Sequence, residues 1–375
     1  MRNVKKSTER ANNPVFGVDL HRDMYDNKTM GKANTHMEHF EDLLFESSDL
    51  LTRVMHGEVK FTRKWDGAPS IFFGVNSDGD AWIARKGLFN KDAKKYYKRS
   101  DFDDDPKFPE ELKEPLWNTL VYLGRSWAGP ESDGYFVQGD LMFTDGPDNG
   151  HFHPNTIQYF TYKIPKKAKV GIVWHTRYVD GRNEGLWIEY GSSVKEHFKL
   201  MDELWMINAH DEIEDFVPEF GQTPVVGNYE HLSEKTKSLF KMYQNALIKG
   251  TTDGSLMDFI FDHMAHTVAS VVQEATKNRK MMEYKVVFEE LAANPYLGSH
   301  YRQMQEYKMF LLKQFNDLPT DYVPQLVLKG HVSVESTDHE GYAVFDGYGN
   351  AAKLVDRKKF SAANFSDDYV KGWSK

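Results

Sequence analysis

The spacing of hydrophobic residues changes twice along this chain, and these changes constrain the fold more than any single motif does. From about 58 to 193, short runs rich in β-branched and aromatic residues are separated by turn residues, a pattern that predicts strands. From about 194 to 326, apolar residues recur every three or four positions, as in packed helices. The strand pattern returns after Pro324. We therefore expect one α+β domain with an antiparallel sheet, interrupted by an inserted helical subdomain.

The same changes divide the chain into four segments. Residues 1–50 are expected to form a polar arm and then an amphipathic helix or helix pair, which begins near "HMEHFEDLLF". Residues 51–193 are the first part of the sheet domain. Residues 194–326 are the helical insertion, and residues 327–375 hold the last strands of the sheet domain.

Two local signals refine the first part of the sheet domain. Asp78 and Gly79 join "SIFFGV" to "AWIARKG", and an Asp-Gly pair between two apolar runs favours a hairpin, because tight hairpin turns need positive φ. Between two later strands, "PEELKEPLWNTLVYLGRSW" has the spacing of a helix. We expect this helix to pack on the sheet.

The composition excludes several classes of protein. Hydrophobic residues make up 40% of the 375 residues and aromatic residues 14%, which is too much for a disordered chain. The chain has no cysteine, which excludes disulfides, thiolate metal sites and a cysteine nucleophile. No apolar run approaches the length of a membrane span, and the polar amino terminus lacks the apolar centre of a secretory signal. We therefore expect a soluble, cytoplasmic protein with no membrane partner.

The charge balance limits how the chain could bind nucleic acid. It has 47 basic and 56 acidic residues, so its net charge of −9 does not favour adhesion to a polyanion. Any contact with nucleic acid must come from a local basic patch, because cations that neutralise phosphates dominate such binding. The nearest candidates are "KKAKV" at 166–170 and "KNRKMMEYK" at 277–285, although such runs are usually solvated faces.

Short segments at predicted strand ends combine charged residues with glycine. Glycine lets a backbone approach a ligand closely, and its charged neighbour supplies the interaction. Lysines and arginines suit phosphates, whereas carboxylates suit a divalent ion, so the set fits a nucleoside triphosphate with metal. The segments are Lys64-Trp65-Asp66-Gly67, Arg85-Lys86-Gly87, Gly139-Asp140 and Glu340-Gly341, followed by Lys353 on the next predicted strand.

In sequence and order these segments resemble the covalent nucleotidyltransferase superfamily, which includes ATP-dependent DNA ligases, RNA ligases and mRNA-capping enzymes. The resemblance covers about 58–180 and 330–365 and does not extend to the arm or the helical insertion. It implies the antiparallel-sheet nucleotidyltransferase fold of ligases. In chain order, the matching segments are "KWDG", "ARKG", "YFVQGDLMF", "VGIVWHTRYV", "HEGYAVF" and "AAKLVDRKKF".

The resemblance implies two catalytic lysines. Lys64 would attack the α-phosphate of ATP and form a lysine–AMP bond, and Lys353 would hold that phosphate and stabilise its developing charge. An ordinary lysine is almost all protonated at neutral pH, so the pKa of Lys64 would have to be lowered. We expect burial beside Trp65, together with the charges of Arg85, Lys353 and a metal ion, to lower it.

The resemblance also implies a nucleotide-binding and metal-binding set. Asp140 and Glu340 would bind Mg²⁺ or Mn²⁺ or the ribose hydroxyls, although Asp140 is one methylene shorter than the glutamate usual in the family. Trp174 is the nearest candidate for an aromatic residue that stacks on the purine, and His175 replaces an often acidic residue. The expected nucleotide-binding residues are Lys64, Asp66, Gly67, Arg85, Asp140, Trp174, Glu340 and Lys353.

Several assignments have rivals in the sequence. Glu184 also precedes a glycine, but we prefer Glu340, because a lysine-bearing strand follows it closely. Lys353 stands without the second lysine that is common in the fifth motif of the family, so Arg357 or Lys358 could substitute. The histidines at 151 and 153, at 36 and 39, and at 263 and 266 have spacings that allow a metal site, but polar loop or helix positions are the simpler interpretation.

The function that the resemblance favours is ATP-dependent nucleic-acid ligation, with RNA a better candidate substrate than DNA. Ligases for nicked DNA and capping enzymes generally carry a β-barrel domain after the fifth motif, and only 22 residues follow Lys353. Two alternatives stay open: a catalytically silent nucleotide- or nucleic-acid-binding protein, and an adenylyltransferase that acts on a protein or small molecule. The "HMEHFEDLLF" segment also resembles uncharacterised ligase-like proteins of large tailed bacteriophages.

Overall fold

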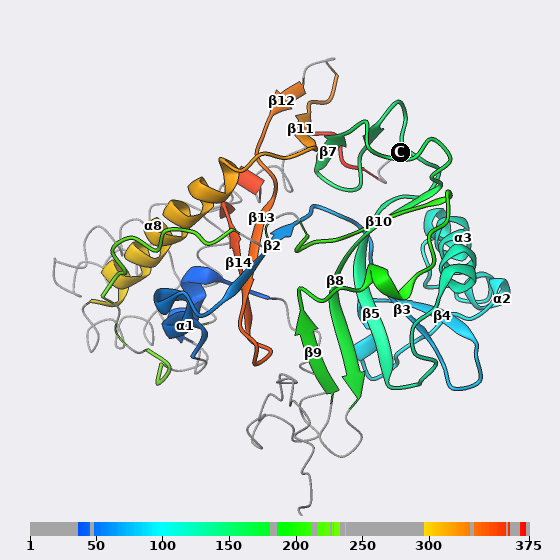
Figure 1. The fold of residues 1–375 in the computed structure, drawn as a ribbon, viewed down its shortest axis with the longest axis horizontal. Coiled ribbons are helices and arrows are strands. Elements are labelled where there is room, and N and C mark those ends of the chain that lie inside the picture. Colours follow the sequence, from blue (N-terminus) through cyan, green and yellow to red (C-terminus); the bar gives the residue numbers. More distant parts are fainter. Residues whose placement is uncertain are drawn as a thin grey trace, which may run out of the picture.

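The chain is described by a computed structural model, and the predicted arm at 1–35 and most of 233–295 lie outside its described residues. The structure describes residues 37–45, 49–180, 186–211, 213, 216–225, 227, 229–232, 237, 296–330, 334–357, 359–360 and 368–372. These residues form three sheets whose strands are mostly antiparallel, with helices packed on them (Figure 1). The prediction of an α+β fold built on antiparallel sheets is therefore confirmed.

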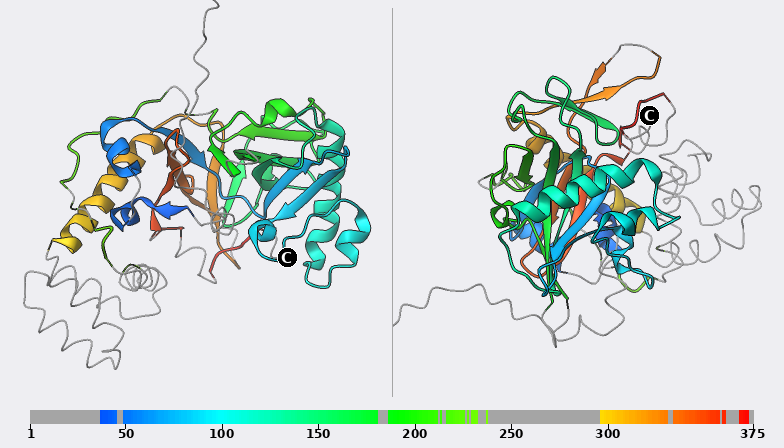
Figure 2. Two further views of the ribbon diagram at one scale, coloured as in Figure 1. Left: turned by 90° about the horizontal axis from the view of Figure 1, so that it is seen from below. Right: turned by 90° about the vertical axis from the view of Figure 1, so that its right-hand side faces the viewer.

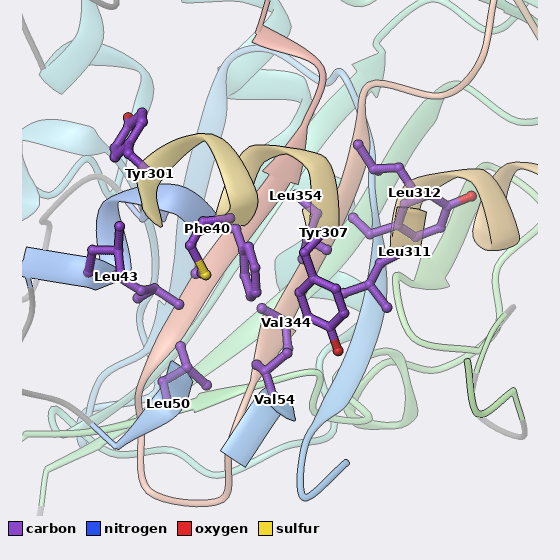
Figure 3. Packing of buried hydrophobic residues seen from close by; sticks show 14 of the residues in the cluster. Phe40, Leu43, Leu50, Val54, Tyr301, Tyr307, Leu311, Leu312, Val344 and Leu354 are labelled. Carbon is purple, nitrogen blue, oxygen red and sulfur yellow. The ribbon is translucent and has the colours of Figure 1, made fainter. Parts of the chain in front are cut away.

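The first sheet contains strands from both ends of the chain. Its order is β1 (Glu38–His39), β14 (Ala351–Val355), β13 (Gly341–Phe345) and β2 (Lys60–Lys64). One face packs against η3 (Phe40–Phe45), α1 (Leu50–His56) and α8 (Leu297–Asn316). Figure 3 shows this packing, in which Phe40 and Tyr307 lie over Val344 and Leu354. Lys64 and Lys353 project from the opposite face of the sheet, because successive side chains alternate between faces.

The second sheet is larger than the first. Its order is β10 (Leu204–Asn208), β8 (Val170–Asp180), β5 (Tyr135–Phe143), β3 (Ser70–Val75) and β4 (Ala81–Arg85), and β9 (Leu186–Tyr190) pairs with β8. α3 (Glu110–Ser126) covers one face, and α2 (Arg99–Asp103) packs beside it. In the two views of Figure 2, α8 and α3 lie on opposite outer sides, so the first and second sheets lie between them.

The third sheet is small and packs near the junction of the other two. Its strands are β12 (Val334–Ser336), β11 (Val323–Val327), β7 (Ile157–Phe160) and β6 (His151–Phe152). Trp65 lies at its core, with ring centroids 5.0 Å from Tyr159 and 4.8 Å from Tyr322. Trp65 is therefore a core residue that fixes the chain on either side of it. Two short 3-10 helices, η4 (Lys86–Phe89) and η5 (Lys195–His197), complete the described elements.

Three predictions about elements have clear outcomes. The Asp78-Gly79 hairpin is confirmed: it joins β3 to β4, and Asn76 Oδ1 accepts hydrogen bonds from the backbone of Asp78 and Asp80. The helix predicted after Pro109 is α3. The helical interpretation of 194–208 is wrong, because 204–208 is β10, which pairs in parallel with β8.

The reason for that error is physical. "LWMI" is a four-residue apolar run, which is too short for its spacing to distinguish a buried strand from a helical turn. Burial of Leu204 and Trp205 against different cores favours the strand. Among the described helices, none combines the length and apolar character that crossing a bilayer requires.

Candidate active site

A cavity of about 940 Å³ lies between the first and second sheets. From the first sheet it is lined by Lys64, and from the second by side chains of β5 and β8, including Gln138, Asp140 and Tyr178. Met37, just before β1, closes one side. This volume is at the upper end of the range for small-molecule sites. Lys64 and Asp140 are far apart in the sequence but therefore line the same cavity.

Lys64 is the last residue of β2 and points into this space. Its register partner on β13 is Gly341, and its Nζ forms a short ion pair with the carboxylate of Glu340. Burial lowers the pKa of Lys64, but the charges of Glu340 and Asp140 raise it more, so the net shift is upward. The expectation of a lowered pKa is therefore wrong for this arrangement, in which Lys64 is an ammonium paired with Glu340.

Asp66 supports the turn that follows Lys64. Its side chain is buried and accepts three hydrogen bonds of 2.7 Å, from the Asn155 side chain and from the backbone N–H groups of Thr156 and Ile157. Its own N–H donates to the Tyr159 hydroxyl at 3.0 Å. Burial is the main cause that raises the pKa of Asp66 to about 7. Asp66 thus ties the turn to the 155–157 segment, a structural role rather than the nucleotide contact that was expected.

Gly67 lets the turn lie directly against Asp140. A Cβ at this position would lie 2.4 Å from the Asp140 Cβ and 2.9 Å from the Met142 sulfur, closer than such atoms can approach. No other residue type fits without displacement of β5. Gly67 and Asp140 both line the cavity, so this contact fixes the distance between the Lys64 turn and the carboxylate.

Asp140 faces the cavity beside His175. The strand pair β5–β8 has a register shift between Gln138 and Gly139, and His175 is the extra residue of that β-bulge. His175 Nε2 lies 3.9 Å from Asp140 Oδ2. Burial raises the pKa of Asp140, but the proximity of His175 and then Lys64 lowers it more, so its carboxylate is ionised.

Trp174 does not line the cavity. It is fully buried on the opposite face of the second sheet, and its ring stacks on Phe198 with centroids 5.1 Å apart. The expectation that Trp174 stacks on a purine is therefore wrong. The bulge at His175 shifts the alternation of side chains along β8, so that Tyr178 faces the cavity instead.

Ser70, Gln138 and Tyr178 form a hydrogen-bonded group that lines an uncharged end of the cavity. Gln138 Nε2 donates to Ser70 Oγ at 2.9 Å, and Gln138 Oε1 accepts from the Tyr178 hydroxyl at 2.6 Å. The Tyr178 ring stacks on Phe136 at 4.7 Å, and Tyr190 lies at the same end. The amide of Gln138 is therefore held in one orientation and keeps one N–H and one oxygen lone pair for a ligand.

Arg85 lines the cavity but faces away from Asp140. It is the last residue of β4 and pairs with Ile71, whose side chain belongs to the core on the α3 side of the sheet. Its guanidinium carbon lies 5.5 Å from the centre of the Phe108 ring. Lys86, the next residue, is exposed and contributes to the lowered pKa of Asp140. Lys86 is thus better placed than Arg85 to meet a phosphate beside Asp140.

Lys353 and Glu340 lie beside Lys64 on the first sheet. Lys353 pairs with Ala343, two residues along β13 from the partner of Lys64, so both lysines project from the same face. Burial, followed by the charge of Lys64, lowers the pKa of Lys353 to about 8. Lys353 therefore lies on the same face of the first sheet as Lys64, and the charges of Lys64 and Glu340 both act on it. Lys353 and Glu340 do not themselves line the cavity.

Arg357 cannot substitute for a missing phosphate-binding lysine. Its guanidinium is buried and bonds Asp42 Oδ2 at 3.0 Å and Glu41 Oε1 at 3.3 Å. Lys308 of α8 bonds Glu41 at 2.9 Å, and Tyr301 donates to Asp42 at 2.7 Å. This buried network ties η3 to α8 and to the end of β14. The other rivals, Glu184 and Lys358, lie outside the described residues.

The described residues offer no ready-made metal centre, because they contain no group of three histidine or carboxylate side chains that could hold an ion. His151 belongs to β6 and packs on Phe160, whereas His153 follows the strand and its Nε2 lies 3.3 Å from the Thr156 carbonyl oxygen. Asp140 and Glu340 both act electrostatically on Lys64, so both carboxylates lie within reach of its ammonium group. A divalent ion would fit there only if phosphate oxygens of a nucleotide completed its coordination, as is usual for Mg²⁺.

A family model matches most of the chain, including both sheets that bound the cavity. The family described as Family of unknown function (DUF6267) matches residues 34–369. The chain belongs to this family. A comparison with curated proteins finds no match, and a comparison with solved structures finds none either. The DUF6267 match spans both sheets that bound the cavity, but DUF6267 membership assigns the cavity no activity.

Three residues that line the cavity of this DUF6267 member were not predicted from its sequence. Gln138 and Tyr178 stood within segments already singled out, and Lys86 stood beside Arg85. Alternation along β5 could have placed Gln138 on the same face as Asp140, two residues later. Tyr178 could not be found that way, because the bulge at His175 has no recognisable sequence signal.

Proposed function

We propose that the cavity binds ATP, that Lys64 becomes covalently attached to AMP, and that the AMP then passes to the 5′-phosphate of a nucleic acid, with RNA the first acceptor to test. The observation that carries the proposal is the position of Lys64. Its amine lies at a cavity of nucleotide size, against the carboxylates of Glu340 and Asp140, with the cation Lys353 on the same face.

The first step would proceed as follows. The Lys64 ammonium loses a proton, and its nitrogen lone pair forms a bond to the α-phosphorus of ATP. The bond from that phosphorus to the bridging oxygen breaks, and pyrophosphate leaves with its electron pair. A second proton leaves the nitrogen as the phosphoramidate forms, and both protons pass to solvent or to pyrophosphate. Lys86, which lines the cavity, and Lys353, on the same face of the first sheet as Lys64, would stabilise the charge on the phosphates.

The ion pair with Glu340 makes Lys64 unreactive until a nucleotide arrives. An ammonium has no lone pair with which to attack phosphorus. A bound nucleotide offers Glu340 ribose hydroxyls, or a divalent ion held by phosphates, as partners in place of Lys64. Glu340 is the largest influence that raises the pKa of Lys64, so its loss as a partner would shift that pKa downward. In this proposal the substrate itself converts Lys64 into a nucleophile.

A divalent ion would supply charge neutralisation at the phosphates, and Asp140 and Glu340 are the residues that would hold it. The adenine would occupy the neutral end of the cavity, where the partly exposed Tyr190 offers aromatic surface and Gln138 offers one donor and one acceptor. The N6 amino group and a ring nitrogen of adenine match that pair, whereas guanine presents two acceptors on its O6 and N7 edge.

The experiment that tests the proposal uses ATP or GTP labelled at the α-phosphate, with Mg²⁺ or Mn²⁺. Label that survives denaturing electrophoresis and is acid-labile but base-stable supports a lysine–AMP bond. The matched control is Lys60→Ala, which removes an exposed lysine from the same strand and should keep the label. Loss of label in Lys64→Ala alone supports the assignment, and no label with any nucleotide or metal overturns it.

The Lys64–Glu340 ion pair also favours a second candidate, a protein that keeps the cavity as a binding site without lysine chemistry. Binding of ATP with no covalent label would support this candidate. Transfer of labelled AMP to 5′-phosphorylated RNA or DNA strands, compared with transfer to protein or small-molecule acceptors, separates ligation from other adenylyl transfer.

A further inference from the structure

We propose that the cavity has a second, basic lobe, formed by Arg85, Lys94 and Lys107, that binds the terminal 5′-phosphate of the polynucleotide that receives AMP. The three cations line the same cavity as Lys64, together with the aromatic residues Tyr96 and Phe108. This inference rests on the proposed function, because it names the acceptor of the same site.

The geometry of β4 separates this lobe from the nucleotide end. β4 is an edge strand of the second sheet, and Arg85 ends it. Ala84 packs with the cleft-side cluster, whereas Arg85 shares a face with Ile83, on the side covered by α3. The cavity therefore continues past the end of β4, and the Arg85 guanidinium lies against Phe108 rather than against Gln138.

A buried carboxylate organises the cations of the lobe. Asp105 is 6% exposed and bonds Lys94 Nζ at 2.8 Å, while Lys94 itself stays half-exposed. Asp105 also accepts hydrogen bonds from the Tyr96 hydroxyl at 2.6 Å and from the Lys107 backbone N–H at 3.0 Å. The hydrogen bonds from Lys94 and then Tyr96 lower its pKa to about 2. The position of Lys94 is thus set in advance, and its remaining N–H groups can meet a ligand.

The charges of the lobe suit a phosphate. Its lining has three cations against two carboxylates, Asp92 and the buried Asp105, in a chain whose net charge is −9. Arginine binds phosphate through two parallel hydrogen bonds, and lysines add point charges. Phe108 and Tyr96 are buried beside these cations and support the wall of the lobe. An uncharged ligand would use none of these cations.

The location of the lobe favours the acceptor over the phosphates of ATP. The triphosphate must lie at Lys64 and Lys86, on the cleft side of the sheet, and the cavity volume leaves room for a second group. In the transfer, an oxygen of the acceptor phosphate attacks the phosphorus of lysine–AMP, and a P–O bond forms. The P–N bond breaks, its electron pair stays on the Lys64 nitrogen, and that nitrogen takes protons from solvent.

The test measures binding by fluorescence anisotropy with the full chain and is independent of the lysine chemistry. The probes are labelled oligonucleotides of one sequence, made as RNA and as DNA, and each is prepared with a 5′-phosphate and with a 5′-hydroxyl. The wild-type chain should prefer the 5′-phosphate by about tenfold or more, the scale of one or two charge-assisted contacts. Lys107→Gln should reduce this preference, and Lys94→Gln with Lys107→Gln should abolish it.

The controls address folding and the source of the phosphate. Lys107 is exposed, so Lys107→Gln carries the test even if loss of Lys94, the partner of buried Asp105, unfolds the chain. Lys91→Gln removes an exposed lysine of the same segment outside the cavity lining and should keep the preference. Saturating α,β-methylene ATP should also leave the preference intact.

Three results would overturn the inference. The first is equal affinity of the wild type for the two ends, and the second is a preference that survives in the double variant. The third is a preference abolished by the ATP analogue, which would assign the lobe to the phosphates of the nucleotide. The labelling experiment decides the proposed function separately. A chain that prefers 5′-phosphate ends but never forms lysine–AMP would keep the phosphate site and lose its role as an acceptor site.

Discussion

Lys64 and Glu340 form an ion pair although 276 residues separate them in the sequence. The pair joins the end of β2 to the residue before β13, at the edge of the cavity between the two sheets. It is the contact that keeps Lys64 protonated, because Glu340 is the largest of the influences that raise its pKa. The nucleophile of the proposed reaction is therefore masked by a residue of the same site.

Replacing Glu340 should unmask this amine. In Glu340→Gln the charge that raises the pKa of Lys64 is absent, so burial should lower that pKa and Lys64 should react faster with an amine-modifying reagent near pH 8. Peptide mapping by mass spectrometry measures the rate at Lys64. Self-labelling with ATP should nevertheless fall, on the order of 10²-fold, because the nucleotide loses a carboxylate partner.

A nearby carboxylate provides the control. Asp338→Asn removes an exposed charge that pairs with Lys359 and should leave the modification rate of Lys64 unchanged. Equal modification rates in wild type and Glu340→Gln would show that Glu340 does not govern the protonation of Lys64.

Gly67→Ala should destabilise the fold. The added Cβ would lie 2.4 Å from the Asp140 Cβ, so β5 or the turn must move, at a cost of about 1–3 kcal/mol in the free energy of unfolding. Gly87→Ala is the matched control in the same cavity, because its Cβ would have its nearest neighbour, Asn90 Nδ2, at 3.6 Å. Urea unfolding of both variants checks this prediction, and similar losses of stability in the two would contradict it.

Gln138→Leu should reduce the preference for ATP over GTP. The substitution keeps most of the side-chain volume but removes the donor and acceptor that Ser70 and Tyr178 orient. A bidentate amide contact to a base contributes about 1–3 kcal/mol, so the ratio of labelling rates with ATP and GTP should fall roughly 5- to 150-fold. An unchanged ratio in competition between the two labelled nucleotides would remove Gln138 from base recognition.

Lys353 should make the stability of the chain depend on alkaline pH. Its pKa is about 8 in the folded chain, lowered by burial and by Lys64, against an ordinary value of 10.5. Between these values the unfolded chain binds a proton here that the folded chain has lost, so this group stabilises the fold increasingly as pH rises. Relative to Lys353→Met, the wild-type free energy of unfolding should increase by about 3 kcal/mol from pH 7.5 to 10.5.

Denaturant unfolding at several pH values measures that increase. Lys60→Met, which removes an exposed lysine, corrects for the general effect of losing one positive charge. A difference between wild type and Lys353→Met that stays constant over this range would mean that Lys353 has an ordinary pKa in the folded chain.

Much of the fold could be predicted from the sequence, because the signals were local. The alternating runs gave the strands of the first and second sheets, and Asp78-Gly79 gave the hairpin between β3 and β4. These inferences needed only neighbouring residues. The expectation that Lys64 and Glu340 share a site came instead from the resemblance to the nucleotidyltransferase superfamily, and their ion pair agrees with it.

The predictions from sequence were wrong where the direction of a side chain depends on contacts with residues far away in the chain. One bulged residue, His175, shifts the alternation along β8, which leaves Trp174 in the core and brings Tyr178 to the cavity. The pairing of 204–208 with β8 overrides an ambiguous apolar run. The raised pKa of Lys64 likewise depends on the carboxylate of Glu340, whose side-chain contact no spacing rule gives.

The most direct test of the account is the site of nucleotide attachment. The wild-type chain is incubated with ATP and Mg²⁺, digested, and mapped by mass spectrometry, with Lys64→Arg as a variant that keeps the positive charge but not the amine. The account predicts an AMP adduct on the peptide that contains Lys64 and its loss in Lys64→Arg. An adduct on a different lysine, or no adduct while ATP is bound, would contradict it.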